Sequence, residues 1–143
     1  IVARARAAKP DARIEGVLIS PMLRGGVETI IGIQRDPVFG PMVMFGLGGV
    51  SVELFRDVAF APAPLDQAGA ERLIGSVRGA RLLEGWRGAP PADRAALVRA
   101  LVRVSQVAAA HPDTIAGIDI NPFLGMEKGA YALDAVIVTH QQG

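Results

Sequence analysis

A short polar segment near the C-terminal end of the chain holds the residues best suited to chemistry. Asp119-Ile120-Asn121-Pro122 follows an apolar run, so it ends a predicted strand. Because side chains alternate along a strand, Asp119 and Asn121 share one face, opposite the neighbouring isoleucines. Asp134 follows Asn121 by 13 residues and is predicted to lie in the middle of the next strand. A carboxylate inside an apolar strand is costly unless it is paired or bound to a cation.

The two strands can bring these oxygen atoms together. If they form a hairpin, Asn121 and Asp134 lie side by side, and two hard oxygen ligands suit magnesium when water and phosphate complete its shell. The alternative is a strand-end turn stabilised by local hydrogen bonds of the Asn and Asp side chains. The spacing by itself leaves both interpretations open.

A second candidate is the glycine-rich segment Gly46-Leu47-Gly48-Gly49, which lies between strand-like stretches. Glycine backbone can approach a phosphate closely and present N–H donors to it. No Gly-Lys-Ser/Thr follows, so this is no Walker A loop, and no long helix follows to make a Rossmann fingerprint. A plain β-turn explains the glycines as well.

Two glutamates stand in similar settings. Glu28 lies in a β-branched strand, and Glu53 follows the glycines. Each is either a surface residue of a strand or a polar contact inside a cleft.

Two arginines are candidates for phosphate contacts. Arg35 either forms a local ion pair with Asp36 or contacts a phosphate through its guanidinium group. Arg87 lies in a loop between glycines, where ligand binding and a structural turn are equally favoured. The adjacent Trp86 is interpreted as a packing residue.

Composition excludes several classes of function. The chain has no cysteine, which rules out disulfides, thiolate zinc sites and cysteine nucleophiles. Its two histidines have no serine or aspartate neighbour at a catalytic spacing. Its formal net charge of +1 implies no strong electrostatic attraction to nucleic acid or membrane. No apolar run approaches the roughly 20 residues of a membrane span. With no secretory signal visible, a cytoplasmic location is expected.

The elements that must position these residues follow from periodicity and capping. Strands are predicted over 13–20, 27–34, 42–45, 52–60, 114–120 and 130–138. The first two are expected to pair as a hairpin around a turn at Arg24-Gly25-Gly26.

Two helices are predicted between the fourth and fifth strands. One begins at an N-cap, Asp66, and the longer one is opened by Pro90 and Pro91, has Asp93 in its first turn and ends at His111-Pro112. Its arginines at 94, 99 and 103 are expected to face water. This order predicts an α+β fold with a largely antiparallel sheet and helices packed on one face.

The length of 143 residues suits a single domain over 1–143. The chain starts at Ile1, and its Ala- and Arg-rich opening resembles the end of a truncated helix over residues 1–12. We therefore expect it to be a fragment of a larger protein.

The motifs, in order along the chain, resemble the C-terminal part of the ATP-grasp domain of NDP-forming acyl-CoA synthetases, the ADP-forming acetate–CoA ligases. More distantly they are similar to the β subunit of succinyl-CoA synthetase. The match extends from about Gly16 to Ile137. It is carried by the following segments: Gly26-Val27-Glu28, Ile31-Gly32-Ile33, Arg35-Asp36-Pro37-Val38-Phe39-Gly40-Pro41, Gly46-Leu47-Gly48-Gly49-Val50, Glu53, Asp57-Val58, Leu83, Gly85-Trp86-Arg87-Gly88, Asp119-Ile120-Asn121-Pro122 and Leu133-Asp134-Ala135.

The resemblance implies roles for the candidate residues. Asn121 and Asp134 match the positions that bind the magnesium of the nucleotide, ATP or ADP. Asp119 matches the acid that contacts a phosphorylated histidine, and Gly48 and Gly49 match the turn near the nucleotide phosphates. Cofactor-binding residues further implied are Glu28, Arg35 and Arg87.

The resemblance also implies a reaction and partners. Acyl-CoA, ADP and phosphate are interconverted with free acid, CoA and ATP through a phosphohistidine that moves between two sites. The partners are the CoA-binding and phosphohistidine domains, in the same protein or in another subunit, and the full-length form is expected to be an oligomer. Those domains and the first ATP-grasp subdomain are missing here, so the chain alone is expected to be inactive and to bind nucleotide weakly at most. An alternative is a regulatory ATP-grasp segment of a protein lysine acetyltransferase with CoA-binding and GNAT domains.

Overall fold

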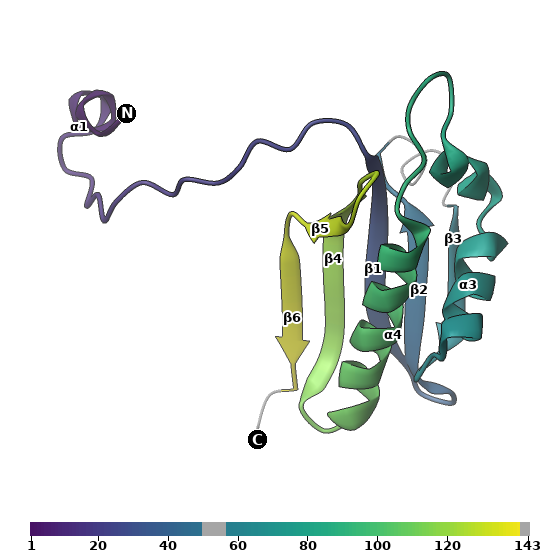
Figure 1. Cartoon of the computed structure of the whole chain (residues 1–143). Coiled ribbons are helices and arrows are strands. Elements are labelled where there is room, and N and C mark those ends of the chain that lie inside the picture. The colour runs from purple at the N-terminus through teal and green to yellow at the C-terminus, as the bar shows by residue number, and fades with distance from the viewer. Residues whose placement is uncertain (50–56, 141–143) are drawn as a thin grey trace.

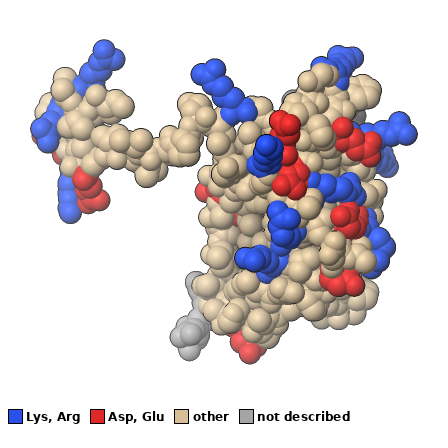
Figure 2. Space-filling model, in the orientation of Figure 1, with Lys and Arg blue, Asp and Glu red and all other residues tan. Residues whose placement is uncertain are grey.

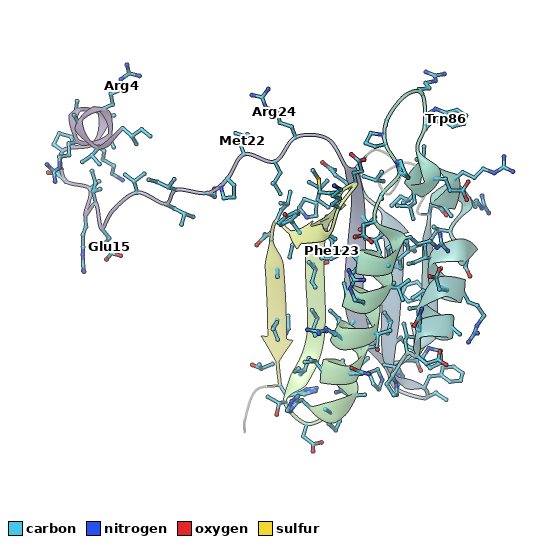
Figure 3. All side chains as sticks on the ribbon, in the orientation of Figure 1. Arg4, Glu15, Met22, Arg24, Trp86 and Phe123 are labelled. Carbon is cyan, nitrogen blue, oxygen red and sulfur yellow. The ribbon has the colours of Figure 1, made fainter. Side chains whose placement is uncertain are left out.

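The computed structural model describes residues 1–49 and 57–140, and its N-terminal part stands apart from the rest. A short helix, α1 (Val2–Ala8), buries no residue. Residues 9–26 then run as an extended segment towards the sheet (Figure 1). Several of its apolar side chains are exposed: Leu18 is 94% and Ile19 89% exposed. The labelled Met22 and Arg24 project from this segment in Figure 3.

The body of the molecule is a six-stranded sheet in which all pairings between the described strands are antiparallel. Its order is β3-β2-β1-β4-β5, with β6 also on β4. The strands are β1 (Val27–Asp36), β2 (Gly40–Leu47), β3 (Val58–Pro62), β4 (Ile115–Gly125), β5 (Ala130–Ala132) and β6 (Ala135–Thr139). The two edges of the sheet are therefore β3 and, for most of its length, β6.

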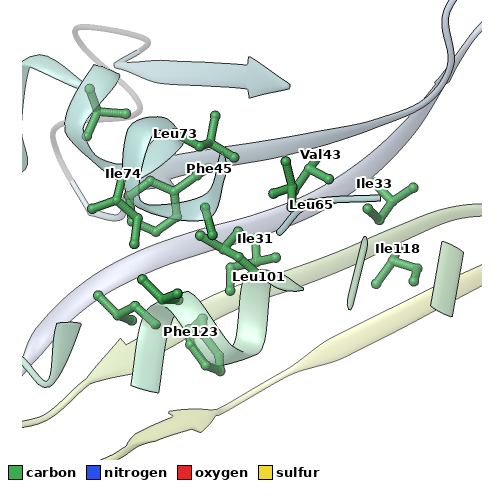
Figure 4. Packing of buried hydrophobic residues seen from close by; sticks show 14 of the residues in the cluster. Ile31, Ile33, Val43, Phe45, Leu65, Leu73, Ile74, Leu101, Ile118 and Phe123 are labelled. Carbon is green, nitrogen blue, oxygen red and sulfur yellow. The ribbon is translucent and has the colours of Figure 1, made fainter. Parts of the chain in front are cut away.

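Helices cover one face of this sheet. They are α3 (Gln67–Ser76), the 3-10 helix η1 (Arg78–Glu84) and α4 (Arg94–Ala110). α3 and α4 lie side by side, with α3 over β3 and β2 and α4 over β2, β1 and β4 (Figure 1). The core lies between the helices and the sheet, with Ile31, Phe45 and Leu101 wholly buried (Figure 4). The expected α+β fold with a largely antiparallel sheet and helices on one face is confirmed.

Helix starts follow the capping chemistry of the sequence. Asp66 is the N-cap of α3, and its carboxylate accepts from Gly69 N at 2.6 Å. For α4 the start was expected at Pro90, but the helix begins at Arg94, and Asp93 is its N-cap rather than a first-turn residue. Asp93 provides the side-chain acceptor that the first turn needs, which a proline cannot do.

The predicted strand over 13–20 is wrong, and so is its hairpin with β1. Both edges of β1 are taken, by β2 on one side and β4 on the other, so the segment finds no partner in the described chain. Of the strand predicted over 52–60, the part from Val58 onward is found as the start of β3. Residues 50–56, which include Glu53, lie outside the described residues.

The last two predicted strands also differ from the structure. β4 runs through Asn121-Pro122 to Gly125 instead of ending there. The final strand is broken into β5 and β6 at Leu133-Asp134, so Asp134 lies in a break and not in mid-strand.

Candidate functional site

The face of the sheet opposite the helices carries the candidate residues. Register and alternation place Glu28 of β1 and Asp119 of β4 on this open face, and Asn121 follows Asp119 two residues later. All three are exposed, whereas Ile31 and Ile118, on the other face, are buried in the core. The alternation predicted for Asp119 and Asn121 therefore holds up to the end of the regular pairing.

Asn121 and Asp134 are direct neighbours. Asn121 N donates to Asp134 O at 3.2 Å, and the pairing continues with Asp119 opposite Val136. Since residues paired across two antiparallel strands share a face, this register places Asn121 and Asp134 on the open face together. Both are exposed, and Asp134 Oδ1 accepts from Ala135 N at 2.9 Å.

A bulge in β4 adjusts the position of Asn121. Thr29 pairs with Phe123 and Ile31 with Ile120, so one residue of β1 opposes the two residues Asn121 and Pro122. Proline has no N–H to donate to the ladder, which makes it compatible with such a break. The wholly buried Thr29 joins the strands here, because its hydroxyl donates to Phe123 O at 2.6 Å. Sequence reasoning did not single out Thr29; a hydroxyl residue directly before the apolar pair Ile30-Ile31 was the available signal.

The glycine segment lies against Glu28 at the same end of β1. Gly46 belongs to β2, and only the following glycines leave the strand. Gly48 N donates to Glu28 O at 2.6 Å, and a Cβ on Gly48 would lie 2.8 Å from the Cβ of Glu28. Gly49 has φ +66°, and its side-chain position would lie 3.6 Å from Glu28 Oε2. Glycine at 48 is therefore required by the close approach of two backbones.

The loop that holds Arg87 borders this segment. Trp86 lines a surface hollow together with Glu28 and Gly48, and it is 57% exposed. The interpretation of Trp86 as a packing residue is wrong, because the loop turns it outward (Figure 3). Arg87 is exposed and has φ 51°, between glycines that also have positive φ. Those flanking glycines were the signal that this tryptophan sits in a tight surface loop.

Arg35 is not brought to the other candidates. It lies seven positions along β1 from Glu28, which is roughly 23 Å along a strand. Its Nε donates to Ile115 O at 2.8 Å, and its Nη2 is buried without a partner among the described residues. The carboxylate of Asp36 accepts from Val38 N and Phe39 N instead of pairing with Arg35. These hydrogen bonds lower the pKa of Asp36.

The partly buried side chain of Asp93 anchors the turn of the β4–β5 hairpin, next to the site. Asp93 accepts from Ala96 N through Oδ1 and from Gly129 N through Oδ2, both at 2.9 Å. The bond from Gly129, then that from Ala96, holds the pKa of Asp93 below its ordinary value, with a smaller contribution from the charge of Arg99. One carboxylate thus caps α4 and ties the hairpin turn to it.

The donor set fits magnesium only as a partial site. No group of three or more His, Cys, Asp or Glu residues is gathered within residues 1–49 and 57–140. Asn121 and Asp134 offer hard oxygen atoms on an exposed surface, and Mg²⁺ typically keeps several waters and binds through one or two carboxylates plus substrate phosphates. The residues present therefore fit a magnesium ion that arrives with a phosphate-bearing ligand.

Comparison with known proteins identifies the family of the chain. Residues 1–139 match the family model described as ATP-grasp domain. The chain belongs to the ATP-grasp family. Among the described helices of this family member, none is both long and apolar enough to cross a membrane.

Relatives of this ATP-grasp chain are ligases. It is 44% identical over 133 residues to acetate–CoA ligase [ADP-forming] I of Archaeoglobus fulgidus, covering 93% of this chain and 19% of the relative. It is 44% identical over 138 residues to the β subunit of acetate–CoA ligase [ADP-forming] I of Pyrococcus furiosus, covering 96% of this chain and 59% of the relative. The chain thus spans about a fifth of the first relative and about three fifths of the second.

Solved structures agree in fold. The dinucleotide-forming acetyl-coenzyme A synthetase 1 of Ca. Korarchaeum cryptofilum, in its apo form, superposes with a TM-score of 0.86 at 45% identity, covering 97% of this chain and 66% of that chain. A complex of the same synthetase holds coenzyme A and Mg-AMPPCP, with its phosphohistidine segment pointing towards the nucleotide-binding site. That complex matches with a TM-score of 0.77 at 47% identity, covering 82% of this chain and 55% of that chain.

Proposed function

We propose that this chain is the nucleotide- and magnesium-binding half of an ADP-forming acyl-CoA synthetase. The observation that carries the proposal is the direct neighbourhood of Asn121 and Asp134 on the open face of an ATP-grasp sheet, joined by the 3.2 Å bond between their backbones. The reaction would interconvert acyl-CoA, ADP and phosphate with acid, CoA and ATP. Similarity to one ADP-forming acetate–CoA ligase and to the β subunit of another supports this assignment.

The side chains on the open face would have separate roles in the reaction. Asn121 Oδ1 and the Asp134 carboxylate would hold the magnesium ion that accompanies the nucleotide. Magnesium, when bound, offsets negative charge on the transferring phosphoryl group. Asp119, on the same face, would accept a hydrogen bond from the imidazole of the visiting phosphohistidine and so orient it.

Glu28, Gly48 and Gly49 would lie near the phosphates, and each would have a different role there. The N–H of Gly48 is already bonded to Glu28 O, so Gly48 contributes close packing. The backbone N–H of Gly49 has no partner among residues 1–49 and 57–140 and would be the donor. The Glu28 carboxylate beside Gly49 would repel a bare phosphate, and it suits a hydroxyl group or a shared cation. Arg87, on the neighbouring loop, supplies a positive charge that a phosphate can use.

Arg35 receives a structural role in this proposal. Its bond to the carbonyl of Ile115 ties β1 to the start of β4, at the far end of the sheet from Asn121. The remaining parts of the enzyme would come from CoA-binding and phosphohistidine domains and from a further nucleotide-binding subdomain. We expect the complete protein to be an oligomer and to work in the cytoplasm.

The single tryptophan of the chain provides a direct test. Trp86 lines the hollow shared with Glu28 and Gly48, so its fluorescence should respond when Mg-ADP binds. The chain should bind Mg-ADP only weakly, with a dissociation constant of about 100 µM or above. Concave sites normally enclose most of a ligand, whereas the candidate residues here lie exposed on one face of a sheet. Submicromolar binding would contradict the need for a second subdomain.

Matched variants separate the magnesium site from general binding. Asp134→Asn should abolish the magnesium-dependent part of the titration, while ADP in EDTA binds both proteins alike. Asp113→Asn, an exposed aspartate in the turn before β4, is the control and should titrate like the parent. Equal magnesium dependence in Asp134→Asn and the parent would refute the assignment.

A further inference from the structure

Among the described residues no strand lies beside the outer edge of β6, and this edge is unlike the other edge of the sheet. Proteins protect edge strands with charges, prolines or bulges, because an unpaired edge can accept another strand. β3 ends in Pro62, and Pro64 follows closely. β6 has the sequence Ala-Val-Ile-Val-Thr, with no charge and no proline, and all five residues are exposed.

The side chains of β6 are apolar on both faces. Val136 and Val138 lie on the open face and Ile137 on the opposite one, and α3 and α4 do not extend over this strand (Figure 1). Ile137 is 59% exposed. In Figure 2 the charged side chains gather over α3 and α4, while the area over β6 is almost free of them. The strand therefore leaves apolar surface uncovered at an edge.

The backbone of β6 has its outward hydrogen-bonding groups at Ile137. Asn121 N bonds to Asp134 O, and Asp119 is opposite Val136, which makes these the pairs that exchange hydrogen bonds with β4. In an antiparallel ladder the residues between them direct their N–H and C=O away from that partner. Ile137, opposite Ile118, is such a residue, and so its donor and acceptor both face outward.

We propose that β6 pairs antiparallel with β6 of a second copy of this chain, with the two-fold axis at Ile137. In this register Ile137 exchanges both hydrogen bonds with its own symmetry mate, and Val136 faces Val138 of the second copy. The same symmetry places Asp134 opposite His140, an acidic and a basic residue, once at each end of the pair. The sequence of β6 is thus complementary to itself in apolar surface, hydrogen bonding and charge.

Asp134 limits the pairing at one point. Its carboxylate accepts from Ala135 N, which occupies the outward donor at the start of β6. The bonds centred on Ile137, and that from Thr139 N to Ala135 O of the second copy, remain free to form. The pairing goes beyond the proposed nucleotide chemistry. It shares Asp134 with the proposed magnesium site, but the apolar surface and the hydrogen bonds of β6 do not depend on that site.

Sedimentation equilibrium of the chain tests the pairing. The parent should show a species of twice the 15.0 kDa of one chain as its concentration rises. Ile137→Lys puts two like charges at the two-fold axis and should weaken the dimer at least about tenfold. The control Val38→Lys, at the exposed tip between β1 and β2, should leave the dimer unchanged. A parent that stays monomeric, or a dimer that survives Ile137→Lys, overturns the proposal.

Cysteine substitution tests the register, because the chain has no cysteine of its own. In the proposed pair the two Ile137 Cα atoms lie about 5.5 Å apart, within the range for a disulfide. Ile137→Cys should therefore form a disulfide-linked dimer under oxidation, and Val136→Cys should do so only when mixed with Val138→Cys. Equal cross-linking of Val136→Cys by itself would refute this register.

The uncovered segment at residues 14–22 offers a competing route to association. Leu18→Lys changes its most exposed apolar residue and leaves β6 untouched. The proposal predicts a dimer as tight as that of the parent. Loss of the dimer in Leu18→Lys, with its retention in Ile137→Lys, would assign association to that segment and overturn the β6 pairing.

Discussion

The residue types on one face of the sheet are explained by packing against the helices, and those on the other face are not. On the covered face, Ile31, Phe45 and Ile118 are buried against α3 and α4. On the open face, Glu28, Asp119 and Asn121 are exposed to water. Packing explains the first set, since each buried apolar side chain is stabilised by removal from water. It does not explain the second set, and that contrast is the physical reason to look for chemistry on the open face.

The largest effect should come from a matched pair of phenylalanines on the two faces. Phe45 is wholly buried and Phe60 is about half exposed. Phe45→Ala should lower the free energy of unfolding by about 3–5 kcal/mol through lost burial and a cavity. Phe60→Ala should cost about 1 kcal/mol or less. Urea unfolding followed by circular dichroism measures both, and similar losses would mean that the open face is covered in solution.

Glycines give the next contrast. In Gly48→Ala the new Cβ would lie 2.8 Å from the Cβ of Glu28 and 3.1 Å from its carbonyl carbon. Overpacking against backbone should destabilise the chain by about 1–3 kcal/mol and reduce the Trp86 response to Mg-ADP. Gly75→Ala, in α3, meets nothing closer than Arg94 Nη2 at 3.9 Å and should stabilise by about 0.5–1 kcal/mol. Opposite signs in urea unfolding are expected; a neutral Gly48→Ala would show that the two backbones can separate.

A smaller effect is expected where the two faces are coupled. Thr29 points into the covered side, yet its hydroxyl holds Phe123, two residues after Asn121. Thr29→Val should cost about 1 kcal/mol through the lost hydrogen bond. By loosening the bulge it should also weaken the magnesium-dependent binding of ADP. Thr29→Ser retains the hydroxyl and should keep that magnesium dependence, whereas equal losses in both variants would indicate packing alone.

Sequence reasoning predicted the covered face well because burial leaves a periodic signal. The β-branched run over residues 27–34 and the helix start at Asp66 both predicted elements that meet the core, β1 and α3. The same signal misled at residues 13–20, since an apolar run shows a capacity to form a strand without showing whether a partner exists. Strand pairing depends on the whole chain, and β4 took the edge of β1 that the nearer segment was expected to fill.

The open face was predicted in its residues and in the neighbourhood of Asn121 and Asp134, but not in the bulge and the break that shape it. Asp119, Asn121 and Asp134 are acid and amide side chains in apolar surroundings, which a sequence displays directly. The bulge opposite Ile30 and the break that releases Asp134 from mid-strand arise from the register between strands. That register is set by contacts such as the bond from Thr29 to Phe123, across 94 residues of sequence, which local patterns do not contain.

The smallest expected effect concerns acid and the junction between α4 and the hairpin of the open face. The bonds from Gly129 N and Ala96 N hold the pKa of Asp93 below its ordinary value of 3.8. A group whose pKa is lower in the folded state stabilises the fold above its unfolded pKa, and that contribution is lost as the pH falls through the folded value. The parent should therefore lose part of its stability below about pH 3.8, and Asp93→Asn should show a smaller loss over the same range. Urea midpoints at pH 5 and pH 3 measure this difference. Parallel losses in the two proteins would mean that other carboxylates govern the acid response, and that Asp93 ties the hairpin to the helix equally well without its charge.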